Sequence, residues 1–355
     1  MLILGIETSC DETSAAVVEE TGDARRPWTV RSNIVASQVA IHREWGGVVP
    51  ELASRQHIRD ICGVVERAMQ DAAVEWTDLG AIAVTQGPGL VGSLLVGVSF
   101  AKSAAVAAGL PVVGVHHLAG HIESLVLQNG ELPLPAVVLV VSGGHTSLFL
   151  VERRGHYELL SRTRDDAAGE AYDKVAKLLG LGYPGGPVID RLAKGGNDRA
   201  VPLPTTRLTH ADRNAPQLKG DLDFSFSGLK TAVLRYVRDR QAAGRTSFPV
   251  LNEDETRDLC ASFQRVVVAT LIDRTFDAAR RHGARSIGVA GGVSANSRLR
   301  ADLKQHGDAR EVPTFLPSLA LSTDNAAMIA AAGLRQFRAG VTSPLDMNAD
   351  ASLSL

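Results

Sequence analysis

Alternating apolar and polar segments predict strands followed by helices along most of the chain. The first segment, LILGIETSCDETSAAVVEE (2–20), is an apolar run, a polar turn and a second apolar run. This pattern predicts a β-hairpin with an unusually polar connection. PAVVLVVSGGHTSLFLVER (135–153) has the same layout, with two glycines in its turn. The likeness indicates a weak internal repeat, in which two similar lobes each open on a hairpin.

Helical periodicity follows each hairpin. Residues 48–75 and 91–108 have apolar side chains at helical spacing, with a strand at 79–86 between them. PVVGVHH (111–117) predicts a strand that leads into a helix. In the second half we expect helices at 169–180, 187–195, 227–241 and 253–282, and a loop over 198–225. RSIGVAGGVSANSRLRADLKQHG (285–307) predicts a strand, a Gly-Gly turn and a helix capped by Ser294, and a last helix should be capped by Ser322 or Thr323. Strands alternating with helices predict an α/β fold.

Composition adds three constraints. A length of 355 residues exceeds what one hydrophobic core usually serves, so two lobes are expected. The net charge of −2 gives no overall attraction to nucleic acid. Cys10, Cys62 and Cys260 are far apart and odd in number, which argues against a disulfide framework. We expect neither a signal peptide nor a membrane span, because charged and small residues interrupt the apolar runs. We expect about the last fifteen residues to form a loose tail.

HHLAGH (116–121) raises the question of a metal site. His117 and His121 are four residues apart, so on a helix both imidazoles lie on one face, close enough to share an ion. The missing ligand should be a hard oxygen donor from an acidic residue, and Asp324 is a candidate. Two histidines and one carboxylate suit Fe(II) or Zn(II). His117 could equally be a core or capping residue, and Asp324 a helix cap. The pair lacks the glutamate of HExxH, which argues against a zinc protease.

Glycine-rich turns are the second candidate feature. VVSGGH (140–145) follows a buried strand, and its backbone N–H groups suit an anion, although a tight hairpin would need the same glycines. TSCDET (8–13) is the matching turn of the first hairpin. GVAGGVSAN (288–296) ends a strand and opens a helix, but it is neither a dinucleotide nor a P-loop fingerprint. Cys10 is a poor candidate nucleophile, because the adjacent acids would raise its thiol pKa.

Eight segments together resemble one enzyme family. They are GIETSCDET (5–13), GPGLVGSLLVG (87–97), VHHLAGH (115–121), VSGGHT (141–146), AYDKVAKLLGLGYPGGP (171–187), DFSFSGLKTA (223–232), GGVSAN (291–296) and STDNAAM (322–328). Their order and spread resemble the bacterial tRNA N6-adenosine threonylcarbamoyltransferases of the TsaD type, once described as O-sialoglycoprotein endopeptidases. The resemblance implies a two-lobed fold of the actin, Hsp70 and sugar-kinase superfamily. We expect an N-terminal lobe of residues 1–117 completed by 325–355, and a C-terminal lobe of residues 118–324.

The resemblance also implies site residues. It implies one divalent metal per subunit, Fe(II) ahead of Zn(II), held by His117, His121 and Asp324. From position alone, Asp11 or Glu12 is expected to orient a water or accept the amine proton. Contacts with the activated substrate are implied for nine residues, namely Val140, Val141, Ser142, Gly143, Gly144, Asp173, Gly186, Asp190 and Asn296.

The implied reaction transfers threonylcarbamoyl from threonylcarbamoyl-AMP to N6 of the adenosine beside the anticodon, in tRNAs that read ANN codons, and releases AMP. An ATP- or ADP-like nucleotide is also expected to fit the cleft between the lobes. The implied partners are tRNA, a smaller inactive paralogue (TsaB-like) and a P-loop ATPase (TsaE-like), in the cytoplasm and away from membranes. Residues 48–75 could form a dimer surface, although such an apolar stripe more often packs in a core.

Three other functions remain open from the sequence. An ATP-dependent small-molecule kinase of the same superfamily leaves the histidine pair without a role. A metalloprotease is disfavoured by the missing glutamate. A non-catalytic scaffold predicts no metal and no cleft chemistry.

Overall fold

The computed structural model describes residues 1–206, 208, 218, 220–242 and 250–355. The chain forms two compact units. Unit 1 comprises Met1–Pro133, Val151–Tyr157 and Phe315–Leu355, and unit 2 comprises Leu134–Leu150 and Glu158–Thr314. The lobe boundaries expected from the sequence, after residues 117 and 324, remain a prediction. Of the loop expected at 198–225, residues 207, 209–217 and 219 fall outside those described.

Unit 1 is built on a five-stranded sheet with the order β3-β2-β1-β4-β5. Strands β1 and β2 form the expected antiparallel hairpin, and β1 pairs in parallel with β4. Because β1 and β4 are buried on both faces, they read as continuous apolar runs in the sequence. The strands are β1 (Leu2–Glu7), β2 (Glu12–Glu20), β3 (Trp28–Ser37), β4 (Leu79–Gly87) and β5 (Val112–His116).

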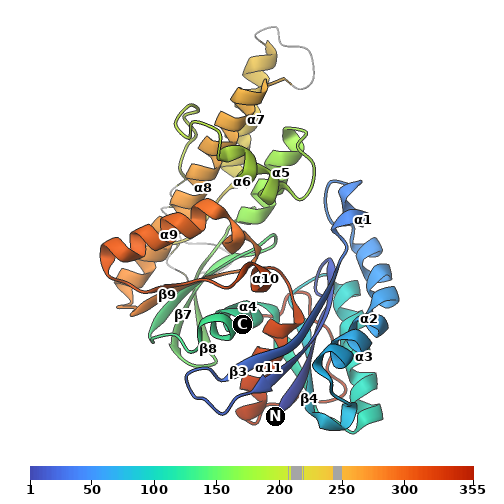
Figure 1. The fold of residues 1–355 in the computed structure, drawn as a ribbon. Coiled ribbons are helices and arrows are strands. Elements are labelled where there is room, and N and C mark those ends of the chain that lie inside the picture. The colour runs from blue at the N-terminus through green and yellow to red at the C-terminus, as the bar shows by residue number, and fades with distance from the viewer. Residues whose placement is uncertain (207, 209–217, 219, 243–249) are drawn as a thin grey trace. The chain divides into compact units, whose positions relative to one another are not determined.

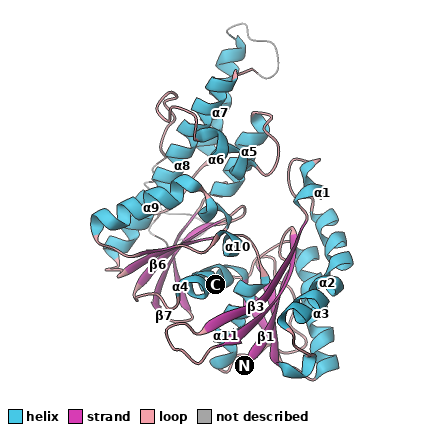
Figure 2. Ribbon diagram, in the orientation of Figure 1, coloured by secondary structure: helices cyan, strands magenta, loops and turns pink. Residues whose placement is uncertain are grey.

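Helices cover both faces of this sheet (Figures 1 and 2). On one face, α2 (Pro50–Ala72) and α3 (Val91–Ala108) pack on side chains such as Leu4 and Ile6. On the other, α4 (His117–Asn129) and α11 (Ala326–Arg338) pack on side chains such as Ile3. Unit 1 also contains the short helices α1 (Val39–Arg43), η1 (Trp76–Asp78) and α10 (Leu319–Ser322).

Unit 2 repeats the strand order of unit 1. Its sheet has the order β10-β9-β6-β7-β8, so three consecutive strands lie side by side and a later strand, β9, pairs in parallel with the first of them. The weak repeat read from the two hairpins is therefore a duplication of topology, and it confirms the expected fold class. The strands are β6 (Ala136–Val141), β7 (Thr146–Arg153), β8 (His156–Arg162), β9 (Ser286–Ala290) and β10 (Thr314–Phe315).

The helices of unit 2 lie close to their expected positions. The long helix α8 begins with a capping box, in which the Asn252 side chain accepts from Glu255 N–H and the Glu255 side chain accepts from Asn252 N–H. The helices are α5 (Ala168–Leu178), α6 (Gly185–Ala193), α7 (Ser227–Ala242), α8 (Glu253–Arg281), η2 (Gly292–Ala295) and α9 (Ser297–Arg310).

Two expected helix caps were wrong. Helix α9 is capped by the Asn296 side chain, which accepts from Leu299 N–H, whereas Ser294 lies in the preceding 3₁₀ turn. Helix α11 is capped by Asn325, which accepts from Met328 N–H, rather than by Ser322 or Thr323. In both cases an asparagine next to the expected cap makes the N-terminal bond.

The expectation of a loose tail was also wrong. Met347 is buried in the core of unit 1, and Ser343 forms a bridge with Val112 of β5. The Asp350 N–H donates to the Gln86 carbonyl at 2.9 Å, and the Lys102 ammonium donates to the Met347 carbonyl at 3.0 Å. The last residues therefore pack along the edge formed by β4 and β5.

Within the described residues, α3 alone is long and apolar enough to cross a membrane by length and composition. Its Leu94, Val98 and Ala101 are buried, and Val98 and Ala101 belong to the cluster that packs on the sheet. Core helices of globular proteins commonly have this composition, so α3 is weak evidence for a membrane span.

Candidate metal centre

The junction of β5 and α4 separates the roles of the three histidines in HHLAGH. His116 caps α4, because its Nδ1 accepts from Leu118 N–H at 3.1 Å. Its Nε2 lies 3.0 Å from the Leu353 carbonyl of the tail, to which it donates. Burial lowers the pKa of His116 to about 4, so the ring is neutral at physiological pH. His116 thus makes its contacts away from the neighbouring pair.

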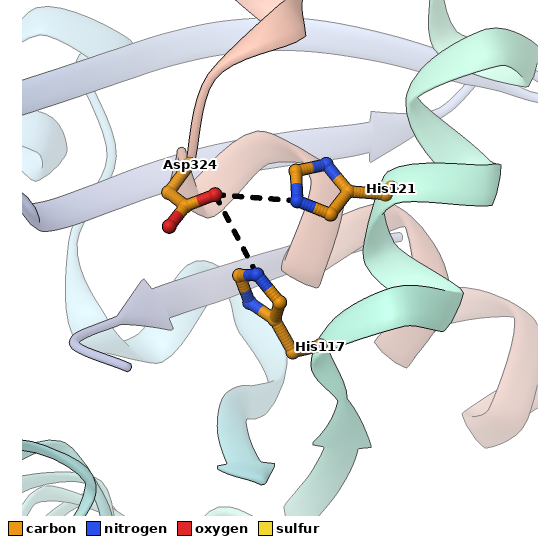
Figure 3. Close-up of side chains that lie close together, drawn as sticks. All are labelled: His117, His121 and Asp324. Carbon is orange, nitrogen blue, oxygen red and sulfur yellow. Dashed lines mark ion pairs between the residues drawn. The ribbon is translucent and has the colours of Figure 1, made fainter. Parts of the chain in front are cut away.

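His117 and His121 converge on Asp324 (Figure 3). His117 Nε2 lies 3.5 Å and His121 Nε2 lies 3.2 Å from the same carboxylate oxygen, Asp324 Oδ1. The three donor atoms lie within 4.8 Å of one another. Two imidazole nitrogens and one carboxylate oxygen at this spacing can bind a single divalent ion and leave further coordination positions open.

Asp324 is positioned by the start of α11. The following residue, Asn325, caps the helix, and Ala326 N–H donates to the Ser14 hydroxyl of β2 at 2.8 Å. These bonds fix the loop that carries Asp324 against the sheet. The side chain of Asp324 is 21% exposed, whereas both histidines are buried, so solvent can reach the centre from the carboxylate side.

The state of His121 fits a bound metal. Its ring is fully buried, and within the described part of the chain neither ring nitrogen has a hydrogen-bond partner. A buried polar atom without a hydrogen-bond partner lowers the stability of the folded protein. Burial lowers the pKa of His121, against the opposing effect of Asp324, so the imidazole is neutral and its Nε2 lone pair can bind a cation. A metal bound between His121 Nε2 and Asp324 Oδ1, which lie 3.2 Å apart, would give this nitrogen a ligand bond.

Charge is concentrated around His117. Burial alone would lower its pKa, but the carboxylates of Asp324 and Glu7 raise it to about 10. Burial raises the pKa of Asp324, but His117 and His121 lower it more, to well below its usual range. Without a metal, a protonated His117 lies between two carboxylates. A divalent cation would take the place of that proton.

Sequence reasoning missed Glu7. This glutamate ends β1, is fully buried, and lies with Oε2 3.0 Å from His117 Nδ1. Burial raises the pKa of Glu7, but His117 lowers it more. The available signal was a carboxylate at the end of an otherwise apolar strand, because such a group requires a partner when it is buried.

The turn after β1 carries the expected acid pair. Asp11 is buried, and Glu12 accepts from the Ser37 hydroxyl at 3.1 Å. Burial, Asp11 and Asp324, in that order, raise the pKa of Glu12 to about 9. The same causes raise the pKa of the Cys10 thiol well above its usual value, which excludes a reactive thiolate at that position.

All nine expected substrate-binding residues lie in unit 2. Val140 and Val141 end β6 and are buried, and the turn after them is closed by the Ser142 N–H donating to the His145 carbonyl at 2.8 Å. Added Cβ atoms at Gly143, Gly144 and Gly186 would meet no described atom within 4 Å. These glycines leave open space over the backbone, which a bound group could occupy.

The polar members of this set have structural partners. Asp173 Oδ1 accepts from Gly185 N–H at 2.7 Å, at the start of α6. Asp190 Oδ1 accepts from the Ser297 hydroxyl at 2.8 Å. Asn296 caps α9 and donates to Gln264 Oε1 at 2.8 Å. These bonds orient the side chains and leave their roles toward a substrate a prediction.

Comparison with known proteins decides the family. The profile of the family described as TsaD, tRNA N6-adenosine threonylcarbamoyltransferase, matches residues 29–331. A protein of that name from Moorella thermoacetica is 50% identical over 353 residues, covering 99% of this chain and 97% of the relative. One from Bacillus subtilis is 47% identical over 356 residues, covering 100% and 96%. The chain belongs to the tRNA N6-adenosine threonylcarbamoyltransferase family.

It is therefore a transferase that acts in tRNA modification. Solved structures support the fold alone. Full-length HypF aligns with a TM-score of 0.58 at 13% identity, covering 95% of this chain and 46% of HypF. Component A of (R)-2-hydroxyglutaryl-CoA dehydratase from Acidaminococcus fermentans aligns with a TM-score of 0.52 at 15% identity, covering 96% and 100%.

Proposed function

We propose that the protein transfers the threonylcarbamoyl group of threonylcarbamoyl-AMP to N6 of the adenosine beside the anticodon, in tRNAs that read ANN codons. The observation that carries the proposal is the convergence of His117, His121 and Asp324 in a chain of this family. Neither a scaffold nor a small-molecule kinase would need two buried histidines directed at one carboxylate oxygen.

The three converging side chains would hold one divalent metal, with Fe(II) ahead of Zn(II). Two neutral imidazoles and a carboxylate are compatible with either ion. When bound, the cation would polarise the threonylcarbamoyl–phosphate end of the substrate. The chain contributes fixed ligands, because His117 and His121 lie one turn apart on a helix whose first turn is anchored by His116.

The transfer forms one bond and breaks one. The exocyclic amine attacks the carbamoyl carbon, the bond from that carbon to the phosphate oxygen breaks, and AMP leaves while the amine gives up a proton. An aromatic amine is a weak nucleophile, so orientation and charge stabilisation must supply most of the acceleration. Asp11 and Glu12 are the proposed proton acceptors. A cation beside Asp324 would offset one cause of the raised pKa of Glu12 and prepare it to accept a proton.

The adenylate end of the substrate is assigned to unit 2. The glycines of the turn after β6 leave open space over the backbone, and backbone N–H groups in such a turn would suit a phosphate. An ATP- or ADP-like nucleotide could bind the same residues. The proposed contacts are Val140, Val141, Ser142, Gly143, Gly144, Asp173, Gly186, Asp190 and Asn296.

The proposed partners are tRNA, a smaller inactive paralogue and a P-loop ATPase, acting in the cytoplasm and away from membranes. The two-lobe division after residues 117 and 324 belongs to the same proposal. Most of the apolar stripe of α2 packs on the sheet, through residues such as Ile61 and Val65, so the helix is chiefly a core element. Ile58, with 64% of its surface exposed, is the apolar side chain of α2 that could contact a partner.

A reconstituted assay tests the proposal. Purified protein, its helper proteins, tRNA and threonylcarbamoyl-AMP are combined, and both AMP and modified adenosine are measured by mass spectrometry. We expect His117→Ala and Asp324→Asn to lose metal and transfer together, while His156→Ala, which removes an exposed histidine from β8, retains both. Transfer at the wild-type rate by folded His117→Ala protein would contradict the metal role. ATP consumption with a small acceptor in place of tRNA would favour the kinase.

A further inference from the structure

Glu7 contacts three groups around its buried carboxylate. Its Oε2 lies 3.0 Å from His117 Nδ1 and accepts from the Thr85 hydroxyl of β4 at 2.7 Å. Its Oε1 accepts from the Ser9 N–H. The side chain is therefore fixed by β4, by the turn after β1 and by the first residue of α4. None of these contacts is with His121 or Asp324.

The two nitrogens of His117 face different partners. Nε2 is directed at Asp324, and Nδ1 is directed at Glu7, with the Ser9 hydroxyl 3.3 Å away. An imidazole can bind a metal through Nε2 only if that nitrogen carries a lone pair, which places the remaining proton on Nδ1. A carboxylate acceptor at Nδ1 favours this tautomer and fixes the plane of the ring.

We propose that Glu7 is a positioning residue of the metal centre, which holds the Nδ1 proton of His117 and thereby aims the Nε2 lone pair at the ion. This inference rests on the metal site proposed above and adds a residue outside its ligand set. Glu7 adds a second negative charge beside that of Asp324, so the two carboxylates together balance a divalent cation.

The effect should be specific to one ligand. Within the described residues His121 Nδ1 has no hydrogen-bond partner, so no acceptor corresponding to Glu7 supports the second histidine. Loss of Glu7 therefore frees one of the two imidazoles to rotate or to change tautomer while the other is unaffected. Removing such a carboxylate partner from a metal-binding histidine typically weakens metal binding 10- to 100-fold.

The test is a titration of the metal-free full-length protein with Co(II), whose visible spectrum reports coordination. We expect Glu7→Ala to raise the dissociation constant for Co(II) about 10- to 100-fold and to change the absorption bands. Glu7→Gln retains an oxygen that can accept the Nδ1 proton, so it should recover most of the lost affinity and a spectrum close to wild type. Thr85→Val removes a donor to Glu7 and should weaken binding several-fold.

Two further variants serve as references. His117→Ala removes the ligand itself and sets the maximum loss. Glu19→Gln removes a negative charge from β2, where Glu19 forms an exposed pair with Arg31, and should bind Co(II) as wild type does. Thermal unfolding of each metal-free variant reports whether the fold survives.

The possible outcomes separate the two proposals. Co(II) binding to wild type and not to His117→Ala, with wild-type affinity and spectrum in folded Glu7→Ala, would overturn the role of Glu7 and leave the metal site standing. Equal losses in Glu7→Gln and Glu7→Ala would also overturn the orienting role. Absence of Co(II) binding in the wild type itself would overturn the metal site and the inference together. If Glu7→Ala fails to fold, Glu7→Gln and Thr85→Val carry the test.

Discussion

Arg335 links α11 to α4, the helix that carries His117 and His121. It lies on α11, and its guanidinium binds Glu123 of α4 in a bidentate pair, with Nε–Oε1 at 2.6 Å and Nη2–Oε2 at 2.8 Å. Nη2 also lies 3.0 Å from Glu131 Oε1, and the guanidinium lies over the Trp28 ring, 5.4 Å from its centroid. Tyr157 donates to Glu123 Oε1 at 2.9 Å.

The expected cost of Arg335→Met follows from this burial. Side-chain exposure is 14% for Arg335 and 3% for Glu123. Removing one member of a buried pair leaves the other charge uncompensated and typically costs about 3–5 kcal/mol. Here Glu123 loses its charged partner, whereas Glu131 keeps a pair with Arg154 at 3.3 Å, so a cost within that range is expected. Arg338→Met, one turn further along α11, removes a pair between Glu20 and a 52% exposed arginine, and should cost far less because solvent screens exposed pairs.

Urea unfolding followed by tryptophan fluorescence measures both variants. The three tryptophans, Trp28, Trp45 and Trp76, all lie in unit 1, so their emission reports on the unit that contains the pair. Arg335→Met should lower the free energy of unfolding several times more than Arg338→Met does. Equal, small losses in the two variants would refute the reasoning, because they would show that the buried pair contributes no more than an exposed one.

Three further predictions concern protons and packing. Because the pKa of metal-free His117 is about 10, metal binding between pH 6 and 8 should release about one proton and strengthen about tenfold per pH unit; affinity independent of pH would contradict this. For Glu12, the folded-state pKa of about 9 exceeds the ordinary 4.5, so the folded protein holds the extra proton between these values and stability falls as pH rises through that window. Glu12→Gln should therefore stabilise the metal-free protein by on the order of 2 kcal/mol more at pH 8 than at pH 5, as measured by urea unfolding, and a gain independent of pH would contradict the cause. Gly5→Ala would place a Cβ 2.3 Å from the Ala326 carbonyl oxygen and should lower the free energy of unfolding by about 1–3 kcal/mol, as measured by thermal unfolding. The control Gly63→Ala lies in open space on α2 and should be neutral or stabilising. Equal effects of the two variants would argue against the close approach of β1 and α11.

The sequence predicted the elements that are buried on both faces better than those that are not. Strands β1, β4 and β6 read as continuous apolar runs because helices cover both sides of them. Strand β3 was not anticipated. It alternates only in part, exposes residues such as Val30 and Arg31, and pairs with β2 through an irregular register near Val17 and Val18. Its position is set by tertiary pairing with β2.

Local rules also failed where neighbouring residues compete. Each helix start offers two acceptable caps, Ser294 or Asn296 for α9 and Thr323 or Asn325 for α11. Which residue caps the helix depends on the residue at which the preceding turn ends. The tail has no periodicity to detect. It is held by hydrogen bonds to its backbone groups, such as those from Gly89 N–H to the Ala351 carbonyl and from the Lys102 ammonium to the Met347 carbonyl, which leave no pattern in the sequence.

In the candidate site too, the sequence revealed what lies within one element and missed a contact between distant elements. The spacing of His117 and His121 was visible because both lie on one helix. Asp324 was identified by its chemistry and by the family resemblance, since more than two hundred positions separate it from the histidines. Glu7 was missed because its pairing with His117 spans 110 positions. A carboxylate at the end of an apolar strand indicates that a partner exists, but it does not indicate which residue that partner is.

The most direct test of the account is the content of threonylcarbamoyl-adenosine in tRNA from bacteria depleted of their own enzyme and supplied with this chain. Nucleoside mass spectrometry compares the wild type with His117→Ala and with the control His156→Ala, at matched levels of folded protein and with the helper proteins present. We predict that the modified nucleoside returns with the wild type and the control and stays absent with His117→Ala. Its return with His117→Ala, or its absence with the wild type, would contradict the account.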